Sequence, residues 1–230
     1  MIAPTLPGSY GGPPLVVRQR SLLQAHADYV ERLLDASGLT APVAIVGSSH
    51  GAVTALELAA RGRASQVIAL APPWTSTPVL FGYGALVFGG TLPLRIARGL
   101  EGLAWSRTPA SARARVGGLM LQFSPTPLAI SDDDLLATIR SVRDFPFLRL
   151  GPGAFRKPVL PDLDQIRCPV VIVYGTAERT VPRSMTERWM QALPHAELIE
   201  LAGLRHVPHL TDPDRIAALL LEQTQTLSTI

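Results

Sequence analysis

Apolar positions along the chain follow two alternating patterns, one typical of helices and the other of buried strands. Residues 22–38 carry apolar side chains at helical spacing. Ser21 directly before this segment and Gln24 within it form a capping-box pattern. A short apolar run at residues 42–46, bounded by proline and glycine, predicts a strand buried on both faces. Residues 52–61 then predict a second helix.

The same alternation of strands and helices returns near the C-terminus. Further strands are predicted at residues 66–71, 169–174 and 197–201. Helices are predicted at residues 183–193 and from residue 213 onward, where Asp212 and Pro213 form a typical helix start. Strands that alternate with helices in this way predict an α/β fold, with a mostly parallel sheet flanked by helices.

The alternation stops between residues 72 and 166. This segment is rich in aromatic residues and glycine and includes a helical pattern at residues 132–143 behind Ser131. We interpret residues 72–166 as an inserted helical lid. Residues 1–71 and 167–230 then form the core.

Composition narrows the range of functions. The 21 basic and 18 acidic residues leave a net charge of +3, which is too small a surplus to predict a nucleic-acid site. Cys168 is the single cysteine, so no internal disulfide is expected, and the default location is the cytoplasm. No stretch predicts stable membrane insertion, and the histidines show no metal-ligand spacing.

The segment Gly47-Ser48-Ser49-His50-Gly51 matches the pattern G-x-S-x-G and falls between a predicted strand and a predicted helix. In this context a sharp turn exposes the central hydroxyl at the carboxyl edge of the sheet, which makes Ser49 a candidate nucleophile. The backbone N–H of His50 would lie at a helix N-terminus and could stabilise an oxyanion. The simpler interpretation of Ser49 is an ordinary turn serine.

These residues resemble the α/β-hydrolase superfamily. Residues 3–8 look like the strand and loop before the first large helix of that family, and residues 203–213 look like the segment around its catalytic histidine. The resemblance implies that His206 is the catalytic base. It also implies an acid after the preceding strand, where Gly175-Thr-Ala-Glu178 offers a glutamate instead of the usual aspartate. Asp212 is the alternative acid.

One expected part of the family pattern is missing upstream of Ser49. The family has strands before residues 2–4, and a His-Gly loop after one of them donates a second oxyanion N–H. No His-Gly pair precedes Ser49. We expect either that the reading frame starts further upstream, which we favour, or that the N-terminal part has rearranged or pairs with another subunit.

The resemblance implies a serine hydrolase that forms an acyl-enzyme at Ser49 and acts on a small or apolar carboxylic ester, without metal or organic cofactor. The expected partner is a small molecule with an apolar portion, and the oligomeric state stays open. A serine nucleophile argues against the epoxide-hydrolase and dehalogenase branches, which use a carboxylate. The alternatives are hydrolysis of a carbon–carbon bond, or a weak or inactive hydrolase-like binding protein.

Overall fold

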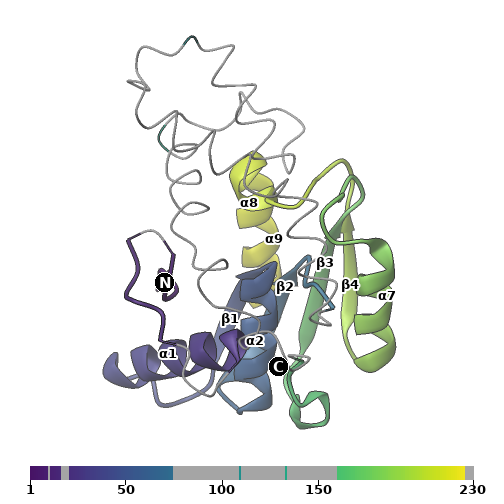
Figure 1. Ribbon diagram of the computed structural model, residues 1–230. Coiled ribbons are helices and arrows are strands. Elements are labelled where there is room, and N and C mark those ends of the chain that lie inside the picture. The colour runs from purple at the N-terminus through teal and green to yellow at the C-terminus, as the bar shows by residue number, and fades with distance from the viewer. Residues whose placement is uncertain (10, 17–20, 75–108, 110–132, 134–159, 226–230) are drawn as a thin grey trace. The chain divides into compact units, whose positions relative to one another are not determined.

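A computed structural model describes residues 1–9, 11–16, 21–74, 109, 133 and 160–225 (Figure 1). Within this part, residues 1–30 belong to one compact unit, and residues 31–74 and 160–225 belong to another. The second unit contains all the strands described below.

A four-stranded parallel sheet forms the centre of the second unit. Its strands are β1 (Val43–Ser48), β2 (Ala64–Leu70), β3 (Val170–Gly175) and β4 (Glu197–Leu201), in the spatial order β1-β2-β3-β4. The register places Ser48 beside Leu70, and Gly175 beside Leu201. Because the strands are parallel, their carboxyl ends meet at one edge, and the loops that leave these ends lie close together.

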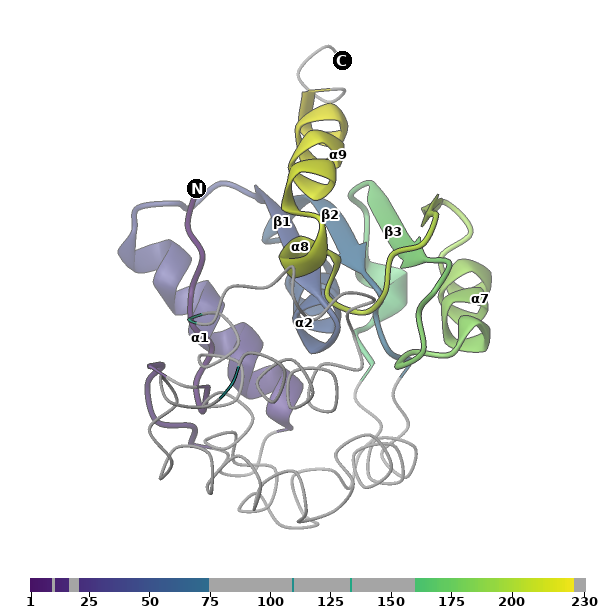
Figure 2. The same ribbon diagram turned by 90° about the horizontal axis from the view of Figure 1, so that it is seen from above.

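Helices cover both faces of this sheet. Figure 2 shows α2 (His50–Ala60) and α7 (Arg183–Ala192) on one face and α9 (Pro213–Gln225) on the opposite face. The short helix α8 (Pro208–Thr211) and the 3₁₀ turn η5 (Leu163–Gln165) complete the described elements of this unit. The chain is therefore an α/β protein with a parallel sheet flanked by helices, as the sequence predicts.

The sheet face under α9 is apolar, because side chains from three strands, the loop after β4 and the helix meet there. This cluster contains Ile68, Leu70, Val171, Val173, Leu201, Leu204, Ile216 and Leu219, all with less than a tenth of their surface exposed. Full burial of one such side chain contributes about 1.5–3 kcal/mol to the free energy of folding. The cluster fixes α9, and with it the loop that connects β4 to α9.

The predicted strand boundaries agree with the structure to within two residues, but one detail of the first strand was wrong. The run at residues 42–46 was expected to be buried on both faces, whereas Ala44 is exposed and Val46 is 43% exposed. These residues are two apart and so share a face. In the described part of the sheet, β1 is an edge strand with one neighbour, β2, so it has fewer surrounding elements than β2 and β3.

Helix α1 (Leu22–Ala36) begins within the first unit. The predicted capping box at the start of this helix is present. The Ser21 N–H donates to Gln24 Oε1 and the Gln24 N–H donates to Ser21 Oγ, each at 3.2 Å. His26 is 1% exposed, and its Nε2 lies 3.0 Å from the carbonyl oxygen of Pro7. This contact links the N-terminal segment to α1.

Most of the predicted lid lies outside the described residues. Residues 75–108, 110–132 and 134–159 belong to this group, so the helical lid at residues 72–166 stays a prediction. Among the described helices, none combines the length and the apolar character that a membrane span requires.

Candidate active site

Ser49 stands at a strained turn between β1 and α2. Its φ of 53° and ψ of −120° lie in a region that L-residues with a side chain rarely adopt. The Ser49 N–H donates to the carbonyl oxygen of Leu70 at 2.8 Å, and the Ser49 carbonyl accepts from the Ala52 N–H at 2.9 Å. The turn is thus held from the neighbouring strand and from the first turn of the helix, as G-x-S-x-G after a strand predicts.

The two glycines that flank this turn have different roles. A Cβ added at Gly47 would lie 2.2 Å from the carbonyl oxygen of Gly51, so only glycine allows the strand and the helix to approach this closely. A Cβ added at Gly51 would meet no heavy atom within 4 Å. The close packing at the turn therefore depends on Gly47.

His50 is the first residue of α2. The first N–H groups of a helix have no intrahelical acceptor and lie at the positive end of the helix dipole. The backbone N–H of His50, directly after Ser49, lies at this positive end of α2, which favours negative charge that develops beside the serine.

Glu178 lies in the loop after β3, and the protein surrounds its carboxylate completely. Its side chain is 0% exposed. The Oε1 atom accepts hydrogen bonds from the backbone N–H of Thr180 and that of Val181, the latter at 3.1 Å. Burial alone would raise the pKa of Glu178, but the hydrogen bond and charge of His206 and these two N–H groups outweigh it and lower the pKa. Glu178 is therefore ionised at neutral pH.

His206 lies in the loop after β4 and is 6% exposed. Its Nδ1 is 2.8 Å from Glu178 Oε2. Because an ionised carboxylate can only accept, Nδ1 must carry the proton, and Nε2 of the neutral ring is then the basic nitrogen. Glu178 thus fixes both the tautomer and the orientation of the imidazole.

Asp212, the alternative acid, has a different place. Its Oδ1 accepts from the backbone N–H of Arg215 at 3.4 Å, and its carbonyl accepts from that of Ile216 at 3.2 Å, which is the arrangement of a helix N-cap. His206 Nδ1 carries a single hydrogen, and it donates this hydrogen to Glu178 Oε2. The geometry therefore favours Glu178 over Asp212.

All three predicted positions lie at the carboxyl edge of the sheet. Ser49 follows β1, Glu178 follows β3 and His206 follows β4. Helix α8, which begins two residues after His206, lies beyond the carboxyl ends of β1 and β2 (Figures 1 and 2). The structure thus brings the Glu178 carboxylate and the His206 imidazole into contact, with Ser49 on its strained turn at the same edge. These are the groups that the predicted nucleophilic triad would require.

Two features of the described residues were not predicted from the sequence. The backbone N–H groups that hold Glu178 were not predicted, although Val181 and Pro182 after the acid hinted at a structured turn. Trp189 of α7 was also missed: it is 0% exposed, its Nε1–H donates to the carbonyl oxygen of Pro72 at 3.0 Å, and its ring meets Trp74 edge-on at 4.8 Å. This contact fixes the direction in which the chain leaves β2.

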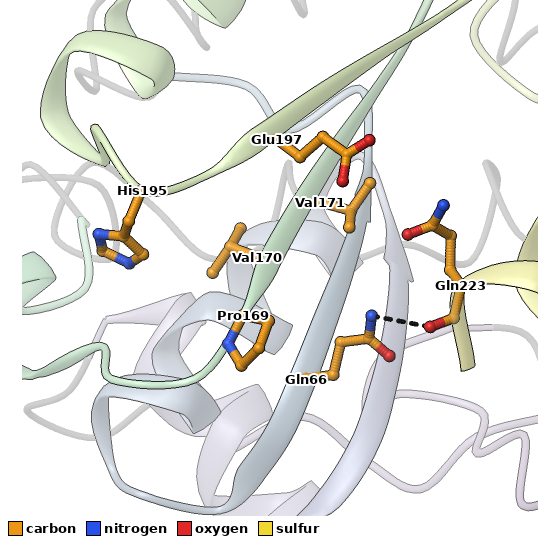
Figure 3. Close-up of a pocket in the computed structure, with 7 residues that line it drawn as sticks. All are labelled: Gln66, Pro169, Val170, Val171, His195, Glu197 and Gln223. Carbon is orange, nitrogen blue, oxygen red and sulfur yellow. Dashed lines mark hydrogen bonds between the residues drawn. The ribbon is translucent and has the colours of Figure 1, made fainter. Parts of the chain in front are cut away.

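A pocket in the same unit lies at the end of the sheet where the strands begin, opposite their carboxyl ends (Figure 3). It is lined by Gln66, Pro169, Val170, Val171, His195, Glu197 and Gln223. Most of these residues stand at the amino ends of β2, β3 and β4, away from the loops that carry the candidate triad. Its volume of about 170 Å³ is below the range of about 300–1,000 Å³ that is typical of ligand pockets.

Comparison with known proteins identifies the class that this fold and site define. The model of the alpha/beta hydrolase family matches residues 1–219. The chain therefore belongs to the α/β-hydrolase family.

Individual relatives differ in the activities that their names state. The chain is 34% identical over 200 residues to epoxide hydrolase EphH of Mycobacterium tuberculosis, which covers 84% of this chain and 91% of the relative. Among solved structures it is similar to the enol-lactonase of Burkholderia xenovorans, with a TM-score of 0.62 and 18% identity over 97% of this chain and 78% of the other. Est816, an N-acyl homoserine lactone degrading enzyme, has a TM-score of 0.64 and 20% identity over 94% of this chain and 80% of the other. These two structures share the fold.

Proposed function

We propose that the protein is a serine hydrolase that cleaves a carboxylic ester with a small or apolar acyl portion. The observation that carries this proposal is the 2.8 Å contact between His206 Nδ1 and the buried Glu178 carboxylate, at the sheet edge where Ser49 occupies a strained turn. A free serine hydroxyl is a weak nucleophile at neutral pH, and a buried, oriented imidazole is what activates it.

In the proposed reaction Ser49 Oγ attacks the ester carbonyl carbon while Nε2 of His206 takes the hydroxyl proton. Glu178 stabilises the imidazolium that forms. The imidazolium then gives the proton to the departing alcohol oxygen, which leaves an acyl group on Ser49. Water attacks this acyl-enzyme with His206 again as the base, which releases the acid and restores the serine.

The His50 N–H would supply one hydrogen bond to the oxyanion of each tetrahedral intermediate. A donor of this kind is typically worth about 10²–10³ in turnover. The lactone-cleaving neighbours share this fold, and a lactone is a cyclic ester, so cyclic esters belong in the first substrate panel.

The name of the M. tuberculosis relative raises epoxide hydrolysis as a second candidate. Attack of the Ser49 oxygen on an epoxide carbon would open the ring and form an ether, which water does not cleave under mild conditions, so the first attack would leave the enzyme alkylated with no product released. Attack on an ester carbonyl forms an acyl-enzyme that water does cleave. Ser49 therefore favours ester hydrolysis.

Two further possibilities stay open as outcomes of the test. The same triad can hydrolyse a carbon–carbon bond in a β-diketone, where the leaving group is a carbanion instead of an alkoxide. The chain can also be a hydrolase-like binding protein that turns over slowly or not at all.

Labelling with a fluorophosphonate probe tests the proposal directly, because the probe reacts with activated serines. We expect the wild-type chain to be labelled and the Ser49→Ala variant not to be labelled. Ser48→Ala is the matched control, since it removes the neighbouring hydroxyl of the same segment and should leave labelling intact. Loss of labelling in Ser48→Ala with labelling kept in Ser49→Ala would contradict the assignment of Ser49 and identify Ser48 as the nucleophile.

Turnover of substrates then separates the remaining candidates. We expect hydrolysis of short-chain nitrophenyl esters and simple lactones, and no sustained hydrolysis of styrene oxide or of a β-diketone. Sustained diol formation from the epoxide would overturn the ester assignment. A folded protein that neither reacts with the probe nor cleaves any of these compounds would be a binding protein.

A further inference from the structure

The loops that carry Glu178 and His206 are joined along their backbones. We name residues 176–181 the acid loop and residues 202–207 the histidine loop. The Thr176 N–H donates to the carbonyl oxygen of Leu201 at 3.0 Å, and the Ala177 N–H donates to that of Leu204 at 3.1 Å. These contacts continue the pairing of β3 with β4 beyond the last sheet pair, Gly175 and Leu201.

The approach of the two loops is close enough to exclude a side chain. A Cβ added at Gly175 would lie 2.2 Å from the carbonyl oxygen of Leu204 and 2.6 Å from its carbonyl carbon. The position of the histidine loop is thus defined by direct backbone contact with the end of β3.

Thr176 adds a side-chain contact to this junction. Its Oγ1 accepts a hydrogen bond from the Gly203 N–H at 2.9 Å. Gly203 has a φ of +76° and forms the turn by which the chain leaves β4 and enters the histidine loop. Thr176 therefore holds the turn that lies three residues before His206, from a position two residues before Glu178.

We propose that the Thr176 hydroxyl is a positioning residue that keeps the His206 imidazole in register with the Glu178 carboxylate. This role rests on the proposed serine-hydrolase function, and Thr176 acts through the histidine loop without touching substrate. The Glu178–His206 contact spans the same two loops, so a change in the Gly203 turn moves one partner of that contact relative to the other.

The expected effect is moderate because Thr176 is exposed and water can replace its hydroxyl on the Gly203 N–H. A hydrogen bond of this kind contributes about 0.5–1.5 kcal/mol, which corresponds to about a 2- to 12-fold change in an equilibrium between ordered and displaced loops. That factor is the upper limit of the effect on the ordered fraction, so we expect kcat to fall by up to about tenfold on its removal, with KM little changed.

The decisive comparison is Thr176→Val against Thr176→Ser. Valine keeps the β-branched shape and removes the hydroxyl, whereas serine keeps the hydroxyl and removes the methyl group. We expect the valine variant to show the lower kcat on a nitrophenyl ester and a slower rate of fluorophosphonate labelling, and the serine variant to restore both to near the wild-type values.

Proton NMR of the His206 Nδ1–H gives a readout that general destabilisation would not produce. A proton shared with a buried carboxylate resonates far downfield, and we expect this signal to shift or broaden in Thr176→Val and to return in Thr176→Ser, with thermal midpoints that stay close to that of the wild type. Thr176→Ala serves as a second hydroxyl-free variant if the valine variant does not fold.

Two results would overturn the proposal. One is a valine variant with the wild-type kcat and an unchanged Nδ1–H signal; the other is a serine variant that is as impaired as valine, because shape and not the hydroxyl would then matter. Failure of the proposed function looks different: the wild type itself would neither label nor turn over, while the Nδ1–H signal would still report whether Thr176 positions the ring.

Discussion

At the scale of single residues, the identity of the acid decides how the proposed triad works. Glu178 is buried, ionised and bonded to His206 Nδ1, whereas Asp212 caps α9. We expect Glu178→Gln to lower kcat by about 10³–10⁴, since an amide can offer its NH₂ to the ring and stabilise the wrong tautomer. Asp212→Asn should stay within about twofold of the wild type, because asparagine is an equally good N-cap. Steady-state ester hydrolysis measures both.

The comparison also has an outcome that would contradict the assignment. A larger loss of kcat in Asp212→Asn than in Glu178→Gln would move the acid to Asp212 and would require the histidine loop to rearrange during the reaction. Circular dichroism of both variants shows whether either loss comes from unfolding.

The sequence predicted Ser49 and His206 because each lies in a short pattern with a fixed structural setting. The sequence could not identify Glu178 as the acid as clearly, because a loop glutamate beside Arg179 is ordinarily solvated. What distinguishes Glu178 is burial together with the N–H groups of Thr180 and Val181, and both arise from the backbone course of the loop after β3. Side-chain patterns do not encode that course.

At the scale of elements, the junction of β1 with α2 gives a prediction about glycine. Gly47→Ala would place a Cβ 2.2 Å from the Gly51 carbonyl oxygen, so the helix must shift away from the strand. We expect the variant to lose about 1–3 kcal/mol of unfolding free energy and to react with the fluorophosphonate at least tenfold more slowly, because the shift also moves Ser49 and the His50 N–H. Urea unfolding and the labelling rate measure the two effects.

Gly51→Ala is the matched control for this junction. Gly51 lies within α2 in open space, and alanine is favoured over glycine inside a helix by about 0.5–1 kcal/mol. We expect this variant to be as stable as the wild type or more so, and to keep its labelling. Equal damage from both substitutions would show that the turn needs flexibility and not close approach.

Strands and long helices were predictable because each buries a continuous or periodic apolar pattern. Helix α8 was not, since the four residues Pro208–Thr211 are too few to show a period. The exposure of Val46 was missed for a different reason: an apolar run predicts a strand, but its neighbours decide whether that strand is central or at an edge.

At the scale of the whole molecule, the fold and the chemistry are supported by different evidence. The family match and the parallel sheet show an α/β hydrolase, and members of one fold carry out many reactions. The EphH relative and the lactone-cleaving structures illustrate this spread. The reaction proposed for this chain therefore depends on the atom at position 49, a serine oxygen, and on the histidine and carboxylate that the fold provides.

The stability of the whole chain should depend on pH through His26. Burial lowers the pKa of His26, although its hydrogen bond to the Pro7 carbonyl partly opposes this effect. Below its ordinary pKa of 6.5 the unfolded chain binds a proton that the folded chain does not, so the unfolding free energy falls as the pH falls from 6.5 toward the folded-state pKa. Above pH 6.5 this contribution is constant. Below pH 6.5 the unfolding free energy cannot change by more than about 1.4 kcal/mol per pH unit for one proton.

Thermal midpoints between pH 8 and pH 5 test this expectation, with His26→Gln as the comparison. Glutamine keeps an N–H that can reach the Pro7 carbonyl but does not titrate, so the variant should lose less stability than the wild type between pH 6.5 and pH 5. The lowered pKa of Glu178 adds a loss of stability only below its ordinary value of 4.5, outside this window. Parallel pH profiles for wild type and variant would mean that His26 is protonated in the folded chain, and that its Nε2–H bond to Pro7 survives with the positive charge in place.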